Sequence, residues 1–306
     1  PSSMRRHGAP GPQQRFYQMD PTDQRTCAFY RQPKFFCWAF GPTFVLSLFA
    51  WGTYAFTYLY CMGTLGDSSL GTFFILIFNG CMVMATASLL KTTFTDPGSV
   101  PKNFQDDVIV RERTPAGEVR FCKVCKHVKP DRAHHCSMSG TCVLKMDHFC
   151  PWVGNTVGFR NYKFFMLFLF YTVLTCWFGC FFSISNTANM MTQADIDGRG
   201  INQIVFTFVA GVFALVLSIF TGQHAYLTLN NLTTLESMDR GRIKSNAYDI
   251  GWRRNWAQVF GTRKLMWFVP TITAVGDGIQ WEINIDESAM NAPPPSSTAN
   301  LGDEIV

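Results

Sequence analysis

The sequence has few charged residues for a soluble protein and too little cysteine for a disulfide-dense secreted domain. Only 15% of its 306 residues are Asp, Glu, Lys or Arg, whereas 47% are hydrophobic, and an average globular chain has roughly 25% charged residues. Such a composition excludes intrinsic disorder, which requires low hydrophobicity. The 11 cysteines are too few for a small disulfide scaffold, and several lie inside apolar runs. No cleavable signal peptide is expected, because the first apolar run starts too late and is too long.

The hydrophobic residues are concentrated in four long stretches without Asp, Glu, Lys or Arg, at 40–62, 68–90, 164–185 and 201–229. A spanning helix needs about 20 predominantly apolar residues, and the fourth stretch is long enough to tilt or to extend beyond the bilayer. Four buried helices of a soluble core are the alternative, but helices in such cores keep a polar face. The expected fold class is therefore an all-α integral membrane protein with four transmembrane helices.

The basic residues predict how these helices are oriented. The short loops 63–67 and 186–200 carry one basic residue, Arg199, and the other 25 lie in the N-terminal, central and C-terminal segments. Because Lys and Arg accumulate on the cytosolic side, both termini and the central segment are expected in the cytosol. The protein would be a multi-pass protein of an endomembrane (ER, Golgi or vacuole) or of the plasma membrane.

The expected organisation follows from these spans. It comprises a cytosolic N-terminal arm (1–39), transmembrane helices 1 and 2 (40–90), a cytosolic cysteine-rich domain (91–163), transmembrane helices 3 and 4 (164–229), a cytosolic C-terminal region (230–289) and a disordered tail (290–306).

The central segment has the spacing of a zinc site. Cys122 and Cys125 form a Cys-x2-Cys pair, and His135 and Cys142 follow 10 and 17 residues after Cys125. Two thiolates in a tight turn, completed by a His and a Cys, are typical of a tetrahedral Cys3His zinc site. A short loop without a hydrophobic core needs such a link in order to fold. The alternative is a set of free thiols in the reducing cytosol.

A second group, Asp147, His148 and Cys150, lies within four residues of sequence just before the third apolar stretch. A thiol with a nearby imidazole that a carboxylate orients is the arrangement that produces a nucleophilic thiolate. From spacing alone, a structural role for His148 and a zinc-ligand role for Cys150 are equally compatible with the sequence.

These segments together resemble the DHHC-type protein S-acyltransferases, or palmitoyltransferases. Members of this family have four spans and a cytosolic cysteine-rich domain between the second and the third. Residues 96–98 (Asp-Pro-Gly) resemble the DPG motif of the family, and residues 246–261, which include Asn255, resemble its conserved terminal motif. The TTxE motif is matched by Thr233, Thr234 and Glu236. Alone, a TTxE is usually a capping box, but the order of these motifs around 147–152 supports the resemblance.

The resemblance implies a two-step transfer of a long-chain acyl group from an acyl-CoA such as palmitoyl-CoA. Cys150 would accept the group and pass it to cysteines of substrate proteins at the cytosolic membrane face, with His148 as general base and Asp147 as its orienting partner. A nucleic-acid partner is excluded by the four spans and by the lack of a basic recognition helix. The candidate residues for substrate binding are Trp152, Thr175 and Gly179 near the acyl chain and Lys129 and Arg132 at the CoA phosphates.

One part of the family pattern is missing. The signature Asp-His-His-Cys has Phe149 as its third residue here, and the family's second zinc site corresponds to Cys136, Ser139, Phe149 and Thr156. Three of these four positions offer no thiolate or imidazole, so we expect one zinc per chain, with packing in place of the second site. The alternative function is a catalytically inactive, membrane-anchored zinc scaffold, against which the retention of Asp147, His148 and Cys150 argues.

Overall fold

The computed structural model describes residues 35–101, 104, 110–114, 117–192, 196–238 and 246–284. Residues 1–34 of the expected N-terminal arm and the whole expected tail lie outside the described residues. Four helices are long and apolar enough to cross a membrane, over Ala39–Leu65, Ser69–Phe94, Tyr162–Met191 and Gly198–Leu229. The expected fold class, a helical membrane protein with a cysteine-rich region between its second and third spans, is therefore confirmed.

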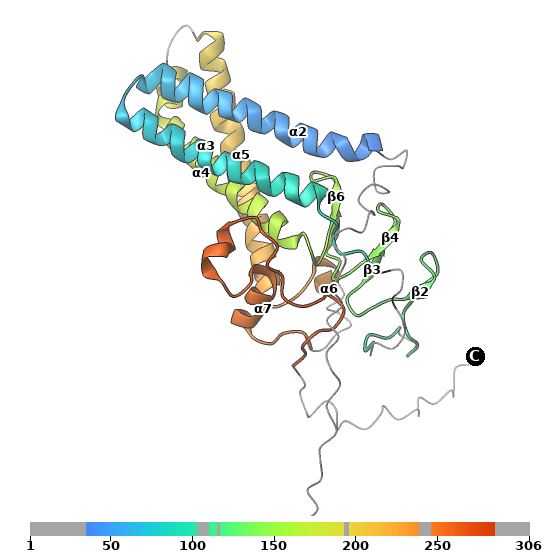
Figure 1. Ribbon diagram of the computed structural model, residues 1–306. Helices are drawn as coiled ribbons and strands as arrows, with labels where there is room; N and C mark the ends of the chain where they lie inside the picture. Colours follow the sequence, from blue (N-terminus) through green and yellow to red (C-terminus); the bar gives the residue numbers. More distant parts are fainter. Residues whose placement is uncertain are drawn as a thin grey trace, which may run out of the picture.

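The first span is built from α2 (Phe35–Thr53), which continues directly into the π-helix η1 (Tyr54–Leu65). The other spans are α3 (Ser69–Phe94), α4 (Tyr162–Met191) and α5 (Gly198–Leu229). After α5 come α6 (Thr234–Met238), α7 (Trp252–Phe260) and the 3-10 helix η3 (Lys264–Phe268). Figure 1 shows α2 and α3 side by side and α5 crossing them at a steep angle, with α6 and α7 at one end of this bundle.

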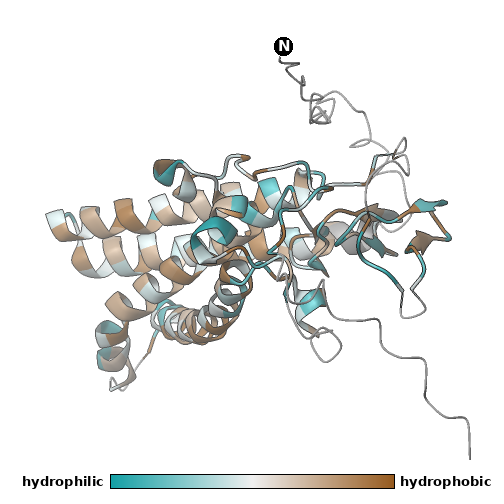
Figure 2. Ribbon diagram, turned by 90° about the horizontal axis from the view of Figure 1, so that it is seen from below, coloured by the Kyte–Doolittle hydropathy of each residue, from teal (hydrophilic) through white to brown (hydrophobic). Residues whose placement is uncertain are grey.

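Aromatic side chains fill the centre of the bundle, where α4 packs along both α3 and α5. Phe56, Phe78 and Phe206 form part of one buried cluster. A Cβ added at Gly179 would lie 2.8 Å from the Phe206 ring, so glycine at this position allows α4 and α5 to approach closely. The four long helices are mostly hydrophobic, and hydrophilic residues gather mainly at the end that carries the connecting segments (Figure 2).

The region between α3 and α4 consists of three antiparallel hairpins. They pair β1 (Phe121–Cys122) with β2 (His127–Val128), β3 (His134–Cys136) with β4 (Thr141–Val143), and β5 (His148–Cys150) with β6 (Asn155–Val157). These hairpins lie at the same end of the bundle as α6 and α7 (Figure 1).

The hairpin β5–β6 is fixed to the end of α3 by asparagine side chains. Asn155 donates to the carbonyl oxygens of Thr92, Thr93 and Thr95 at 2.9 to 3.1 Å. Asn161 donates to Thr92 as well. Thr92 and Thr93 lie in the last turn of α3 and Thr95 is its C-cap, so their carbonyls have no partner within the helix. The asparagine side chains therefore both cap α3 and hold the hairpin against it.

The first span also contacts this hairpin. A Cβ on Gly41 would overlap the carbonyl oxygen of Pro151, which directly follows β5. One turn further along α2, the Phe44 ring lies 6.1 Å from the Trp152 ring. Glycine at position 41 is therefore required for the backbone of α2 to pass this close to the end of β5.

Candidate active site and metal centre

The four side chains that the spacing predicts as zinc ligands meet at one point. Nδ1 of His135 lies 3.6, 3.3 and 4.0 Å from the sulfurs of Cys122, Cys125 and Cys142. Zn–S and Zn–N bonds of about 2.3 and 2.0–2.1 Å would place such atoms about 3.6 Å apart around a tetrahedral ion, so the donors fit zinc. Burial raises the pKa of the Cys142 thiol, and a bound cation would keep this sulfur as a thiolate.

The strand β5 carries His148 and Cys150 on one face, because residues two apart in a strand point to the same side. Nδ1 of His148 lies 2.6 Å from Oδ2 of Asp147, and the Cys150 thiol is carried two residues further along the same strand. Asp147 is 1% exposed and Cys150 is 6% exposed. Carboxylate, imidazole and thiol therefore follow one another in a largely buried series.

Asp147 is held in place by the segment that follows α5. Thr234 donates its backbone N–H to Oδ1 at 2.8 Å and its hydroxyl to Oδ2 at 2.9 Å. Thr233 and Glu236 form a capping box at the start of α6, with reciprocal hydrogen bonds of 3.1 and 2.9 Å. The capping box fixes the first turn of α6, and with it both Thr234 donors that face Asp147.

Asn255 connects α7 to the same end of the bundle. Its side-chain amide donates to the carbonyl of Leu229, the last residue of α5, at 2.7 Å. Its carbonyl oxygen accepts from the N–H of Ile250 at 3.1 Å. Asn255 is 1% exposed, so a buried amide joins the C-terminal region to the end of the fourth span.

The surroundings of His148 favour its protonated form. Burial alone would lower the pKa of His148, but hydrogen bonds and charges of Asp147 and Cys150 raise it to about 9. For Asp147, burial raises the pKa, and the hydrogen bond and charge of His148 more than offset this effect and lower it. An imidazole that a carboxylate orients, next to a cysteine, is the set of groups that cysteine nucleophiles use.

Comparison with known proteins identifies the family to which this chain belongs. Residues 116–241 match the family model described as DHHC palmitoyltransferase. The palmitoyltransferase ZDHHC15 of Xenopus laevis is 34% identical, with 82% of this chain and 83% of the relative aligned. The chain belongs to the DHHC palmitoyltransferase family. Human palmitoyltransferase ZDHHC2 is 32% identical over 82% of this chain and 77% of its own, and the probable protein S-acyltransferase 12 of Arabidopsis thaliana is 37% identical over 66% and 74%.

Arg132, which we expected to bind the CoA phosphates, is buried in this DHHC family member and bound to Glu236. The guanidinium of Arg132 is fully buried and binds the Glu236 carboxylate at 2.7 and 2.8 Å. It also donates to the side-chain and backbone oxygens of Asn231, and the rings of Tyr248 and Trp281 lie 4.4 and 4.7 Å away. The prediction that Arg132 binds phosphate is therefore wrong, because its donors already hold the C-terminal region.

The roles of the other residues that we expected to bind substrate stay predictions. Trp152 is 53% exposed next to Cys150 in sequence, and Lys129 is half-buried. Thr175 and Gly179 are both buried on one face of α4, as their spacing of four residues predicts. This face points into the bundle, where Gly179 contacts Phe206.

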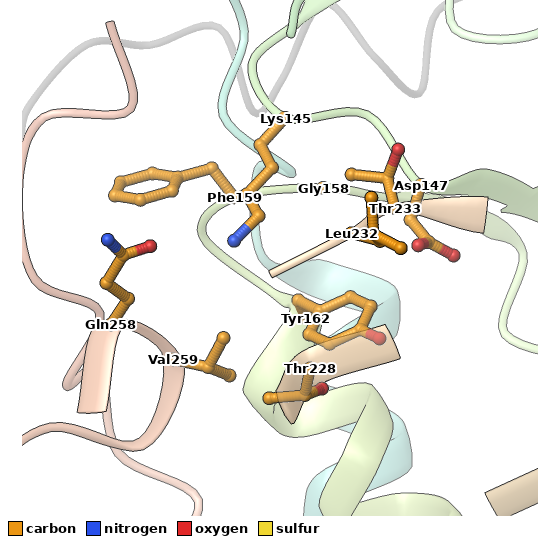
Figure 3. Close-up of a pocket in the computed structure, with 10 residues that line it drawn as sticks. All are labelled: Lys145, Asp147, Gly158, Phe159, Tyr162, Thr228, Leu232, Thr233, Gln258 and Val259. Atoms are coloured by element: carbon orange, nitrogen blue, oxygen red, sulfur yellow. The ribbon is translucent and has the colours of Figure 1, made fainter. Parts of the chain in front are cut away.

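A small cavity of about 20 Å³ lies beside Asp147. Such a volume suits a single water molecule and is far too small for an acyl chain, since ligand pockets usually measure about 300–1,000 Å³. Figure 3 shows the residues that line it, which are Lys145, Asp147, Gly158, Phe159, Tyr162, Thr228, Leu232, Thr233, Gln258 and Val259.

The positions of the family's second zinc site are occupied by packing and hydrogen bonding. Phe149 packs against a cluster that contains Cys136, Val143 and Met146. The hydroxyl of Thr156 donates to the Cys136 sulfur at 3.1 Å. Among the described residues, no group of potential metal ligands includes Cys136, and one zinc per chain stays a prediction.

Sequence reasoning missed two residues beside the active site. His224 of α5 is 2% exposed and lies close to Asp147 and His148. The hydroxyl of Tyr162, at the start of α4, is 3.0 Å from Nδ1 of His224. The available signal was a histidine inside an otherwise apolar span, where ionisable side chains are rare.

Proposed function

We propose that the protein is an S-acyltransferase that moves a long-chain acyl group, such as palmitoyl, from acyl-CoA through Cys150 to cysteines of substrate proteins. The observation that carries this proposal is the arrangement of Asp147, His148 and Cys150 at one end of the membrane-spanning bundle, where Asp147 is hydrogen-bonded to His148 and Cys150 lies on the same face of β5 as His148. The names of the relatives, which are palmitoyltransferases from animals and a probable S-acyltransferase from a plant, support the same activity.

In the first step, the Cys150 thiolate attacks the carbonyl carbon of the acyl-CoA thioester. A new C–S bond forms to Cys150, the C–S bond to CoA breaks, and the departing CoA thiolate takes the proton held by His148. In the second step, neutral His148 removes the proton from a substrate cysteine, whose sulfur attacks the acyl-enzyme. Cys150 leaves as a thiolate, which restores the imidazolium–thiolate pair, and Asp147 keeps His148 oriented throughout.

Zinc at Cys122, Cys125, His135 and Cys142 would have a structural role: it would crosslink the hairpins β1–β2 and β3–β4, whose strands are only two or three residues long. We assign the region 91–163 and the region after α5 to the cytosol, because nearly all basic residues outside the N-terminal arm lie there. Acyl-CoA and the thiols of substrate proteins are then on the same side as Cys150, and the bilayer accommodates the acyl chain.

The alternative is an inactive zinc scaffold of the same family. It would have no use for a buried carboxylate that receives three hydrogen bonds and is aligned with an imidazole and a thiol. Burial of a charge is costly unless it is paired, and a scaffold would gain more stability from apolar packing at this position. The geometry therefore favours the enzyme over the scaffold.

Incubation of the purified full-length protein with radiolabelled palmitoyl-CoA tests the proposal. We expect a hydroxylamine-labile label on Cys150 that Cys150→Ser abolishes, and His148→Ala should slow labelling by about 10²–10⁴-fold. Cys136→Ala is the matched control, because Cys136 is an equally buried thiol in a neighbouring hairpin. Full hydroxylamine-labile labelling of Cys150→Ser, or no labelling of the parent protein, would contradict the assignment.

A further inference from the structure

His224 is an ionisable side chain buried inside the fourth candidate span. It lies in α5, 2% exposed and six positions before the C-cap residue Asn230. A polar group in this environment is costly unless it is hydrogen-bonded, and ionisable residues within membrane spans usually mark functional sites. The mechanism above uses Asp147, His148 and Cys150 but assigns no role to His224.

The contacts of His224 join the spans α4 and α5 close to Asp147 and His148. Its Nδ1 is 3.0 Å from the hydroxyl of Tyr162, the first residue of α4. Its ring makes edge-to-face contacts with Phe165 and Phe220, at centroid distances of 5.2 and 4.6 Å. Phe165 in turn contacts the His148 ring edge-to-face at 5.2 Å, so the same aromatic wall touches both imidazoles.

His224 is also close to the reacting groups themselves. One of its ring nitrogens, a ring nitrogen of His148 and a carboxylate oxygen of Asp147 all lie within 4.8 Å of one another. The ring centroids of His148 and His224 are 5.8 Å apart. Tyr162 reaches the same place from α4, because it lines the small cavity beside Asp147 (Figure 3).

We infer that His224, held by Tyr162, is a positioning residue that sets the orientation of the His148–Asp147 pair. This inference rests on the proposed function, because the pair matters only if His148 transfers protons. Asp147 binds Nδ1 of His148, and the rings of Phe165 and His224 lie 5.2 and 5.8 Å from the His148 ring, so these contacts restrict rotation of the imidazole. The bond between Tyr162 and His224 also fixes α4 against α5 at this level.

Two simpler explanations fit the contacts less well. A metal ion shared by Asp147, His148 and His224 would have to displace existing hydrogen bonds, since Asp147 accepts from His148 and twice from Thr234. Ordinary packing would be met by a phenylalanine or leucine without the cost of burying two polar ring nitrogens. A positioning role uses both the ring and the nitrogen that Tyr162 binds.

The test compares three variants of the full-length protein by the single-turnover rate of Cys150 acylation across palmitoyl-CoA concentrations. His224→Phe retains a ring but removes both nitrogens, and His224→Asn retains a polar group near the position of Nδ1. Gln203→Met is the matched control, because Gln203 is also a buried polar residue of α5, 21 positions away. The melting temperature of each variant is measured in the same preparation.

We expect His224→Phe to lower the maximal acylation rate by about tenfold, equivalent to about 1.4 kcal/mol, with the half-saturating palmitoyl-CoA concentration unchanged. His224→Asn should recover part of this loss, and Gln203→Met should match the parent. An unchanged rate in His224→Phe, or equal losses in the Phe and Asn variants that follow their melting temperatures, would overturn the positioning role alone. No acyl-enzyme in the parent would overturn the proposed function and this inference with it.

Discussion

Replacing Asp147 by Asn removes one negative charge and keeps the shape of the side chain, so it isolates the electrostatic part of the active site. The pKa of His148 is raised to about 9, against an ordinary value of about 6.5. This difference corresponds to about 3 kcal/mol in favour of the imidazolium, and Asp147 and Cys150 share it. We therefore expect Asp147→Asn to return the pKa of His148 toward its ordinary value and to slow acylation at pH 7, by on the order of 10²-fold at most.

The pH dependence distinguishes this effect from misfolding. Because the folded-state pKa of His148 is raised, its contribution to stability is complete below about pH 6.5 and is lost as the pH rises through about 9. In thermal unfolding, parent and variant should thus differ most below about pH 6.5 and converge as the pH rises through about 9. In rapid-quench acylation they should differ most between pH 6.5 and 9, where His148 is protonated only in the parent, and converge near pH 6. Thr234→Val, which removes one donor to Asp147 and keeps the charge, should show a smaller loss. Identical pH profiles for the parent and Asp147→Asn would refute the reasoning.

Three further outcomes are expected. Elemental analysis should find one zinc per chain, with Cys122→Ser unfolding the hairpin region and Cys136→Ala remaining mild; two zinc ions per chain would contradict the single site. Thr175→Trp should shift the acyl-CoA preference in competition assays toward shorter chains, because the side chain faces the bundle interior; an unchanged length profile would place the acyl chain elsewhere. Arg132→Met should destabilise the fold by about 3–5 kcal/mol, since it leaves Glu236 as an unpaired buried charge, and a melting temperature equal to that of the parent would argue against this.

The spans could be predicted from the sequence because a charge-free run of bilayer length leaves the chain few alternatives. Their ends were less predictable, since helices can continue past the apolar run into polar residues. α4 starts at Tyr162 and extends to Met191, whereas the apolar stretch covers only 164–185. The change of the first span to a π-helix at Tyr54 has no signature that we recognised in the sequence.

In the candidate site, contacts between residues close in sequence could be predicted, and contacts between distant residues could not. The group of Cys122, Cys125, His135 and Cys142 could be predicted because its members lie within about 20 residues of one another. Zinc sites also use only a small set of characteristic spacings between ligands. Arg132 was misassigned because its partner Glu236 lies 104 residues away. A basic residue in a loop looks the same whether it faces a phosphate or a buried carboxylate.

The backbone contact between Gly41 and Pro151 has a consequence for the membrane in which the protein works. The first candidate span has 27 residues, more than the roughly 20 that cross an average bilayer, and an overlong span adapts to bilayer thickness by tilting. At Gly41 there is no room for even a methyl group, so α2 cannot tilt toward β5 without displacing Pro151, the residue that follows Cys150. We therefore expect the position of the nucleophile to depend on bilayer thickness.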